Sequence, residues 1–128
     1  MRRVRTRKRI TPEKRIQNDI IAILRMHHYS VFRGNVGLLY TRDGRKMRTG
    51  LPNGFPDLFG WRWSDRQIFF IEVKTPTGKI RPDQKAFHLD LQNRKVIHGI
   101  ARSVDDALKI VDEGLIGYGF EDNSVYTN

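Results

Sequence analysis

One stretch of the chain carries four polar side chains of the types that metal-assisted hydrolysis uses. In chain order they are Asp57, Glu72, Lys74 and Gln84. Two carboxylates on a rigid base, with room for water and substrate oxygens, make a Mg²⁺ or Mn²⁺ site. A lysine beside such a site can stabilise the charge that develops on a phosphate, or orient and help deprotonate the attacking water. The set therefore predicts metal-assisted hydrolysis of a phosphodiester.

The triplet Glu72 to Lys74 also has a simpler interpretation, a surface salt bridge at the end of a strand. Such triplets are common, so the triplet taken alone favours the salt bridge. The Pro56-Asp57 pair upstream and a polar first helical turn around Gln84 downstream change that balance. Together they favour the hydrolytic site.

The apolar run from Ile68 to Ile71 must hold these side chains in place. An unbroken run rich in β-branched and aromatic residues is typical of a central strand with both faces covered. Side chains alternate along a strand, so Glu72 and Lys74 share one face while Val73 points to the other. Opposite charges at the end of a buried strand are costly unless they are paired or bind a ligand.

A hairpin should bring Asp57 to the same place. The expected elements are strands from Asp57 to Trp63 and from Gln67 to Lys74, joined by the two-residue loop Asp65-Arg66. In that register Asp57 lies directly opposite Lys74 and diagonal to Glu72, with all three on one face. A shift of one residue would turn Asp57 to the other face, so the prediction depends on the register.

Three segments around these residues resemble a family of nucleases. They are G-F-P-D-L at 54–58, I-E-V-K at 71–74 and G-K-I-R-P-D-Q-K at 78–85. Together they resemble the PD-(D/E)xK nuclease superfamily, and specifically its VRR-NUC group, over about Thr11 to Leu108. That group includes small stand-alone phage proteins and the nuclease domain of a eukaryotic interstrand-crosslink repair enzyme. The resemblance implies a restriction-endonuclease-like core.

The resemblance also implies a role for each side chain of the set. The expected catalytic residues are Glu13, Asp57, Glu72, Lys74 and Gln84. Asp57, Glu72 and the Val73 carbonyl would hold Mg²⁺ or Mn²⁺, with Glu13 helping through water. Lys74 would activate water or steady the transition state, and the glutamine would hold the water or the lysine, or bond a phosphate oxygen. The leaving group would be the 3′-oxygen, which gives 5′-phosphate ends.

The N-terminal helix should bring the further carboxylate to the site. A helix from Thr11 to about Met26 begins with a threonine N-cap and a proline. Glu13 precedes Ile16 by three residues and Ile20 by seven, so it lies on the same inward face. The E-x-x-I-Q pattern resembles the family's first-helix motif, whose glutamate lines the active site, and Gln17 can hydrogen-bond there. The alternative is that Glu13 merely complements the helix dipole.

Basic side chains gather on segments that should face nucleic acid. R-G-N-V-G at 33–37, which overlaps an expected strand from Tyr29 to Asn35, resembles the family's R-x-N-x-G before its substrate-facing loop. Leu38 to Gly50 contains an Asp-Gly turn and four basic residues, which indicates a hairpin or flap directed toward DNA. A solvated surface loop is the alternative. The candidate contacts are Arg33, Asn35, Arg42, Arg45, Lys46, Arg48, Lys79, Arg81 and Lys85.

The composition supports a nucleic-acid partner. The chain has 128 residues, enough for one domain, and a formal net charge of +10, which favours a polyanion. An anionic membrane surface is disfavoured because no basic helix has a clean apolar stripe, and no apolar run is of membrane-spanning or signal-peptide type. The absence of cysteine fits a reducing cytoplasm.

We divide the chain into a basic arm at 1–10, which either follows a phosphate backbone or serves as a solubilising tail, and a nuclease-like domain at 11–128.

The remaining segments complete the expected fold. They are a helix beginning at Arg81 and Pro82, a strand from Lys95 to Ala101, a helix from Val104 to about Glu113, and an irregular segment from Gly114 to Asn128. Trp61 and Trp63 are interpreted as core residues. The four histidines are interpreted as structural or surface groups, of which only His88 could approach the site. The order of elements predicts an α/β single domain with a mixed central β-sheet flanked by helices.

These observations predict a Mg²⁺- or Mn²⁺-dependent DNA endonuclease. Stand-alone members of the group resemble junction resolvases, and symmetric cleavage of a four-way junction needs two sites in a C2 dimer. We therefore expect a homodimer that prefers branched or junction DNA, in the cytoplasm of a bacterial host cell if the source is a phage or a bacterium. A non-catalytic basic nucleic-acid-binding module on the same fold and a small RNA-binding protein remain as alternatives. The intact catalytic set favours the enzyme over both.

Overall fold

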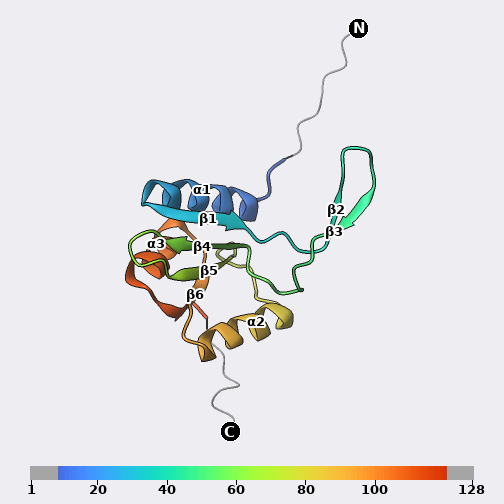
Figure 1. Ribbon diagram of the computed structural model, residues 1–128. Coiled ribbons are helices and arrows are strands. Elements are labelled where there is room, and N and C mark those ends of the chain that lie inside the picture. Colours follow the sequence, from blue (N-terminus) through green and yellow to red (C-terminus); the bar gives the residue numbers. More distant parts are fainter. Residues whose placement is uncertain (1–8, 121–128) are drawn as a thin grey trace.

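The computed structural model describes residues 9–120 and folds them around one mixed β-sheet. The helices are α1 (Pro12–Met26), α2 (Pro82–Asn93) and α3 (Val104–Glu113). The strands are β1 (Tyr29–Arg33), β2 (Leu38–Tyr40), β3 (Lys46–Arg48), β4 (Leu58–Arg62), β5 (Ile68–Val73), β6 (Ile97–Ala101) and β7 (Ile116–Tyr118). The central sheet has the order β1-β4-β5-β6-β7, and helices flank it (Figure 1). The expected α/β fold with a mixed sheet is confirmed.

Helices cover both faces of the central sheet around β5, which lies antiparallel to β4 and parallel to β6. On one face, Ile20 of α1 and Ile110 of α3 are fully buried in the core that also contains Phe69 of β5. Burying a side chain of this size contributes roughly 1.5–3 kcal/mol to stability. On the other face, the ring of Phe87 from α2 packs on that of Phe70, with centroids 6.2 Å apart. This packing fixes the end of β5, where the predicted site begins.

The β4–β5 hairpin closes with a longer turn than predicted. The Arg62 N–H donates to the Gln67 carbonyl at 3.0 Å, so four residues, 63–66, form the turn. The Asp65 carboxylate accepts hydrogen bonds from the Gln67 N–H at 3.2 Å and from the Arg62 guanidinium, which stabilises this turn. Arg66 completes it in the left-handed conformation, with φ of 61°. The predicted two-residue loop is therefore wrong.

The longer turn shifts the hairpin register by two residues. Leu58 pairs with Ile71. Extending that register by one residue places Asp57 opposite Glu72, and not opposite Lys74 as predicted. Because the side-chain period of a strand is two, the shift leaves Asp57 on the predicted face. Both strands begin and end one residue inside their predicted bounds.

Aromatic side chains occupy the part of the sheet face that α2 leaves uncovered. Trp61 and Trp63 are 41% and 57% exposed, so their interpretation as core residues is wrong. Trp61 packs on Phe32, another exposed ring, with centroids 5.3 Å apart. Trp63 lies in the turn after β4, where its indole N–H donates to the Ser30 hydroxyl at 2.9 Å. The alternation along β4 correctly placed these rings on one face of the sheet. It did not show that α2 leaves this part of the face uncovered.

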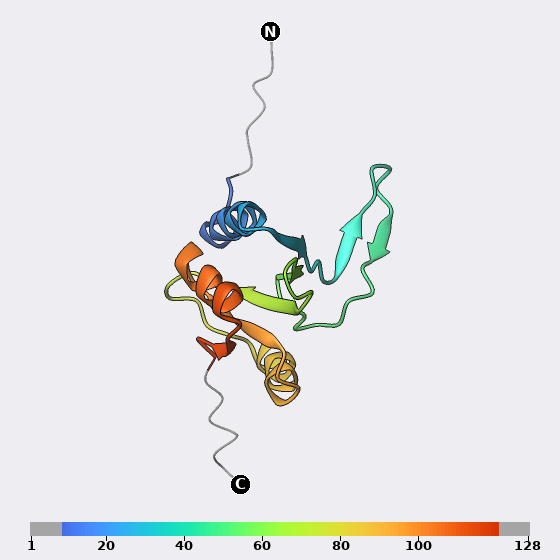
Figure 2. The same ribbon diagram turned by 60° about the vertical axis from the view of Figure 1, so that its left-hand side comes forward.

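The strands β2 and β3 form a two-stranded ribbon, residues 38–48, that stands away from the central sheet (Figure 2). Its turn contains Gly44 at φ of 84°, as the Asp-Gly pair indicated. The chain leaves the body and returns at one point, where the Thr49 N–H donates to the Gly37 carbonyl at 3.0 Å. The hairpin expected between Leu38 and Gly50 is confirmed, whereas its contact with DNA remains a prediction.

The chain after α3 forms a strand that the sequence did not predict. Gly114 ends α3 in the left-handed conformation, and β7 then pairs in parallel with β6. The irregular segment predicted from Gly114 onward is therefore wrong at β7, where Gly117 weakens the strand pattern. Residues 1–8 of the predicted arm at 1–10, and residues 121–128 of the C-terminal segment, lie outside the described residues. Within residues 9–120, no helix combines the length and the apolar character needed to cross a membrane.

Candidate active site

A pocket of about 290 Å³ lies at the edge of the central sheet where β4 begins and β5 ends. It is lined by Glu13, Lys14, Gln17, Arg33, Gly34, Asn35, Val36, Gly54, Phe55, Asp57, Lys74, Arg81 and Gln84. Four of the five predicted catalytic residues line this pocket, and they come from α1, the start of β4, the end of β5 and α2. The fifth, Glu72, is buried behind it and contacts Gln84.

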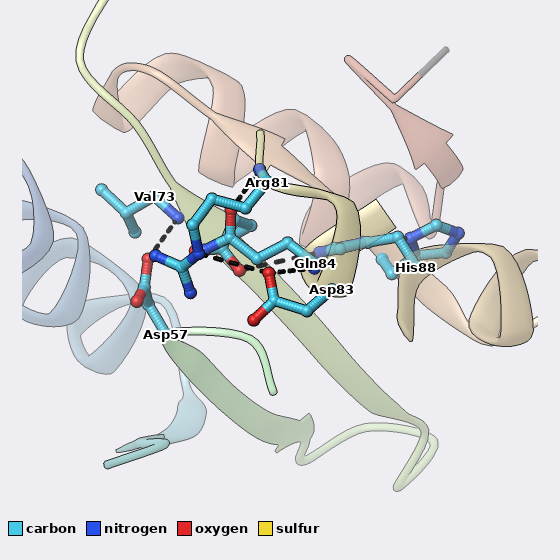
Figure 3. A network of polar contacts seen from close by, with 8 residues as sticks. Asp57, Val73, Arg81, Asp83, Gln84 and His88 are labelled. Atoms are coloured by element: carbon cyan, nitrogen blue, oxygen red, sulfur yellow. Dashed lines mark hydrogen bonds and ion pairs between the residues drawn. The ribbon is translucent and has the colours of Figure 1, made fainter. Parts of the chain in front are cut away.

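The backbone of the neighbouring strand holds Asp57 in the pocket. Its Oδ2 accepts a hydrogen bond from the Val73 N–H at 2.8 Å (Figure 3). Its own carbonyl accepts from the Gly34 N–H at 2.8 Å. Within a strand, the N–H and C=O of one residue point to the same side, so the Val73 carbonyl also faces the Asp57 side of β5. The predicted metal-binding groups of these two residues therefore face each other.

Glu72 is fully buried, and its surroundings disfavour a lone negative charge. Its Oε1 accepts from the Gln84 side-chain amide at 3.1 Å. Its Oε2 has no hydrogen-bond partner among the described residues and lies 4.0 Å from Nε2 of His88. Burial raises the pKa of the Glu72 carboxyl to about 10; the neighbouring Asp57 carboxylate acts in the same direction, and Lys74 acts against both. Without a cation, this carboxyl group holds a proton at neutral pH.

Gln84 is held at both ends of its side-chain amide. Its Oε1 accepts from the Arg81 N–H at 3.0 Å, which closes the first turn of α2, while its Nε2 donates to Glu72 (Figure 3). Gly54, at φ of 86°, packs the loop before β4 against this turn, since a Cβ there would lie 2.3 Å from the Asp83 carbonyl oxygen. The sequence predicts that Gln84 holds water, the lysine or a phosphate oxygen. In the structure, the side-chain N–H of Gln84 instead donates to the Glu72 carboxylate.

Lys74 and Glu13 add opposite charges to the pocket. Lys74 is 7% exposed and is the only buried lysine or arginine among residues 9–120. Its N–H donates to the Ala101 carbonyl at 3.0 Å, which fixes the backbone where β5 ends. Glu13 is half-buried in the first turn of α1, and its charge contributes to the raised pKa of Glu72. Glu13 thus lies on the predicted inward face and also at the end of the helix where a carboxylate is favoured.

Of the predicted nucleic-acid contacts, Arg33, Asn35 and Arg81 line the pocket. The Arg33 guanidinium donates to the Gln17 side-chain oxygen and, at 2.6 Å, to Oδ1 of Asn18, which ties the end of β1 to α1. Asn35 lies beyond β1, which ends at Arg33, so the expected strand from Tyr29 to Asn35 is two residues too long. Arg81 remains exposed and pairs with Asp83 at 3.2 Å.

The other predicted contacts are exposed side chains outside the pocket. They are Arg42, Arg45, Lys46 and Arg48 around the ribbon, and Lys79 and Lys85 near the start of α2. Arg45 pairs with Asp43 at 3.0 Å, but both side chains are largely exposed, so the pair contributes little stability. The ribbon therefore offers its positive charges to solvent.

Two neighbours of the site were not identified from the sequence. Asn18 anchors Arg33, and His98 of β6 contacts His88 with 2.8 Å between their Nδ1 atoms. His88 itself follows Gln84 by four residues, which places both on one face of α2 and explains why it approaches Glu72. No local spacing pairs His98 with it, because that contact joins two separate elements.

The donor set fits a hard divalent cation, although within residues 9–120 no group of three or more His, Cys, Asp or Glu side chains is arranged to hold one. The unpartnered Oε2 of Glu72 and the raised pKa of its carboxyl indicate neighbouring acids with too little positive charge beside them. The Asp57 and Glu72 carboxylates and the Val73 carbonyl would hold such an ion, with water and substrate completing its ligands. It would supply positive charge to a phosphodiester and its attacking water.

Metal binding to this site should strengthen as the pH rises. The pKa of Glu72 is about 10 in the folded protein against an ordinary value of 4.5, so a cation must displace its proton. For the same reason the metal-free protein should lose stability as the pH rises between these values, because the folded state binds a proton that the unfolded chain has released. Manganese titrations and thermal melts at pH 6 and pH 9 measure both effects. The control is E72Q, whose thermal midpoint should change less between pH 6 and pH 9 than that of the wild type. A manganese affinity that is equal at both pH values would contradict this prediction.

Comparisons with known proteins identify the family of this chain. The sequence profile of the VRR-NUC domain matches residues 11–105. A solved structure described as a VRR-NUC domain superposes with a TM-score of 0.60 at 22% sequence identity, and the match covers 83% of this chain and 100% of the other. A search among curated proteins found no match. The profile match spans most of the chain, and this domain implies a nuclease-type function. The chain therefore belongs to the VRR-NUC domain family of the PD-(D/E)xK nuclease superfamily.

Proposed function

We propose that this protein is a Mg²⁺- or Mn²⁺-dependent endonuclease that hydrolyses phosphodiester bonds of DNA. The observation that carries the proposal is the meeting of Asp57, Glu72 and Lys74 at one edge of the sheet, beside an open pocket. The two acids come from adjacent strands and face each other, and the lysine is the buried cation that follows them. Carboxylate oxygens are the ligands that a hard cation prefers, and a nearby positive charge favours the hydrolysis of a phosphodiester.

Each residue of the set has a separate task in this proposal. Asp57, Glu72 and the Val73 carbonyl hold the ion. Lys74 orients the attacking water or neutralises charge on the phosphate, because it lines the pocket and is only 7% exposed. Gln84 acts on the carboxylate of Glu72, to which it donates, and Glu13 acts through water from the far end of the pocket lining. The other residues that line the pocket form the walls of the space in which substrate would bind.

The basic groups define a path for DNA across the pocket. Arg33 and Arg81 supply positive charge in the pocket itself, and the exposed cations of the ribbon extend it away from the sheet. The ribbon carries no long recognition element, and its contacts are of the type that hold phosphates rather than read bases. A preference for DNA shape, such as a branch or a four-way junction, is therefore the substrate choice that we propose.

Symmetric cleavage of a four-way junction requires two active sites. The pocket acts on one strand, so we propose that the protein works as a C2 homodimer that places a second pocket on the opposing strand. Sedimentation of the protein with and without junction DNA tests this point. A monomer under both conditions, at concentrations that support cleavage, would exclude the dimer.

Cleavage assays decide whether the proposed activity exists. A labelled four-way junction, a linear duplex, a splayed-arm duplex and supercoiled DNA would each be incubated with Mg²⁺, Mn²⁺ or EDTA, using the wild type and E72A. Metal-dependent cleavage that E72A abolishes would support the nuclease, and the preferred substrate would define its type. Tight, salt-sensitive binding without cleavage under any metal would point instead to a basic nucleic-acid-binding module on the nuclease fold.

The ribbon should contribute to DNA affinity without contributing to chemistry. Arg42 and Lys46 are exposed and lie outside the pocket, so the double variant R42S/K46S should weaken binding of all DNA shapes similarly. If both contact phosphates, the slope of log affinity against log salt should fall by roughly 1.8, since each contact contributes about 0.9. Anisotropy titrations with Ca²⁺ at several salt concentrations measure this slope. The control is R94S, at the other end of α2, and an unchanged slope for the double variant would remove the ribbon from the DNA path.

A further inference from the structure

A row of buried polar side chains continues behind Glu72, and the proposed reaction does not use it. Nε2 of His88 lies 4.0 Å from Oε2 of Glu72, and Nδ1 of His88 lies 2.8 Å from Nδ1 of His98. Nε2 of His98 then lies 2.9 Å from Oε1 of Gln92. Both imidazoles are fully buried. The row thus runs from the end of β5 through α2 and β6 and ends on α2 again.

Tight packing holds the two imidazole rings in place. Phe120 stacks against His88 with ring centroids 5.6 Å apart and meets His98 edge-on at 5.8 Å. The Gln92 amide is confined by Gly117 of β7, where a Cβ would lie 2.1 Å from its oxygen. A side chain at position 117 would therefore displace the amide. The row is built into the packing of α2 against β6 and β7.

The contact between the two rings permits only one proton arrangement at a time. Both rings are buried away from water, which favours their neutral form, and their Nδ1 atoms lie 2.8 Å apart and so share one hydrogen. A neutral imidazole donates from one nitrogen and accepts at the other. One Nδ1 must therefore donate to the other, and the Gln92 amide determines which, according to whether its oxygen or its nitrogen faces His98.

One of the two arrangements suits a Glu72 carboxylate that binds a cation. With Oε1 of Gln92 facing His98, as in the structure, His98 donates to Gln92 and His88 donates to His98 from Nδ1, so Nε2 of His88 carries no hydrogen. When the Gln92 amide turns over so that its nitrogen faces His98, the row reverses, and Nε2 of His88 carries a hydrogen directed at the unpartnered Oε2 of Glu72. The 4.0 Å gap between these two atoms must shorten for this hydrogen bond to form. Gln84 already holds Oε1 at 3.1 Å, so a second donor would fix the plane of the group. Such outer hydrogen bonds orient the ligands of metal ions.

We propose that His88, held by His98 and Gln92, is a positioning residue that orients the Glu72 carboxylate toward a bound divalent cation. The inference rests on the proposed function, because it assigns Glu72 to that ion. It goes beyond the proposed function by adding to the site a second row of residues, none of which lines the pocket. His88 acts through Glu72 and touches neither substrate nor ion.

Manganese affinity of the full chain without DNA tests the proposal separately from cleavage. H88F, which removes both ring nitrogens, should weaken Mn²⁺ binding by roughly tenfold to a hundredfold, and H88Q, which keeps a donor near Nε2, should recover most of the loss. The matched control H27Q changes an exposed histidine and should bind as the wild type does. DNA binding in EDTA should be the same for all four proteins. Equal Mn²⁺ affinity for H88F and the wild type would overturn the inference.

Nitrogen NMR of the wild type gives an answer that requires no variant to fold. With Mg²⁺ bound, Nε2 of His88 should carry the hydrogen and Nδ1 should not, and Q92L should lose this preference. The opposite tautomer in the Mg²⁺-bound protein would overturn the inference even if H88F proved unstable. If the wild type bound no Mn²⁺ at all, both the proposed function and the positioning role of His88 would fail. If the wild type bound Mn²⁺ and H88F bound it equally well, only the positioning role would be contradicted.

Discussion

Replacing Asp57 with asparagine should lower the rate of DNA cleavage on the order of a thousandfold or more, because a metal ligand contributes several kcal/mol to the transition state. The variant keeps an oxygen that can accept the Val73 N–H bond, so the start of β4 should stay in place. It loses the negative charge that adds to the effect of burial on the pKa of Glu72, so that pKa should fall. The loss of cleavage would therefore come from the missing ligand and not from a damaged fold.

Single-turnover cleavage of a labelled junction in Mg²⁺, beside DNA binding in Ca²⁺, separates these effects. D57N should bind DNA as tightly as the wild type, or more tightly, since a negative charge beside the phosphate is gone. The control is D90N, because Asp90 is an exposed acid of α2 whose only ion pair in the described structure is with Arg94 at 3.5 Å. Wild-type cleavage by D57N would show that the pocket is not the active site.

Replacing Lys74 with methionine should lower cleavage by roughly a hundredfold to a thousandfold, as removal of a preorganised charge does in other active sites. Lys74 also lowers the pKa of Glu72, so without it the carboxyl group should hold its proton more strongly and bind the ion less well. The effect should appear in the maximal rate more than in DNA affinity. Raising the Mn²⁺ concentration should restore only the part of the loss that comes from weaker metal binding.

The fold should survive this substitution. Exchanging a buried charge for an apolar side chain of similar length is often neutral or stabilising, so the thermal midpoint of K74M should not fall greatly. K79M is the matched control, because Lys79 lies in the loop between β5 and α2 but is exposed and outside the pocket. Equal losses of cleavage in K74M and K79M would mean that general positive charge, and not the buried lysine, is what the reaction needs.

The candidate site was predictable because it depends on which face of a strand each residue occupies, and less on the exact residue with which it pairs. The turn of the β4–β5 hairpin proved two residues longer than expected, since Asp65 is held by the Arg62 guanidinium and the Gln67 N–H. Asp57 moved from its predicted partner to Glu72 but stayed on the same face. The helical spacing that turns Glu13 and Gln84 inward is likewise local. Such patterns can be read directly from the sequence.

The features that could not be predicted join residues from separate elements. The contact of His88 with His98 depends on how α2 packs on β6, and no spacing in the chain encodes that distance. The exposure of Trp61 depends on how much of one sheet face α2 covers, whereas alternation reports only which face it occupies. The strand β7 forms because β6 offers an edge to it, in a segment whose glycines oppose regular structure.

The single attachment point of the ribbon has a consequence for the evolution of this domain. The chain departs and returns between Gly37 and Thr49, and the ribbon forms no strand pairs with the central sheet. Its length and sequence can therefore vary, by insertion, deletion or exchange, at a modest entropic cost and without moving Asp57. If the ribbon contacts nucleic acid as proposed, a change in this one appendage would alter the shapes that the protein binds, while the core that positions Asp57 and Glu72 stays constant.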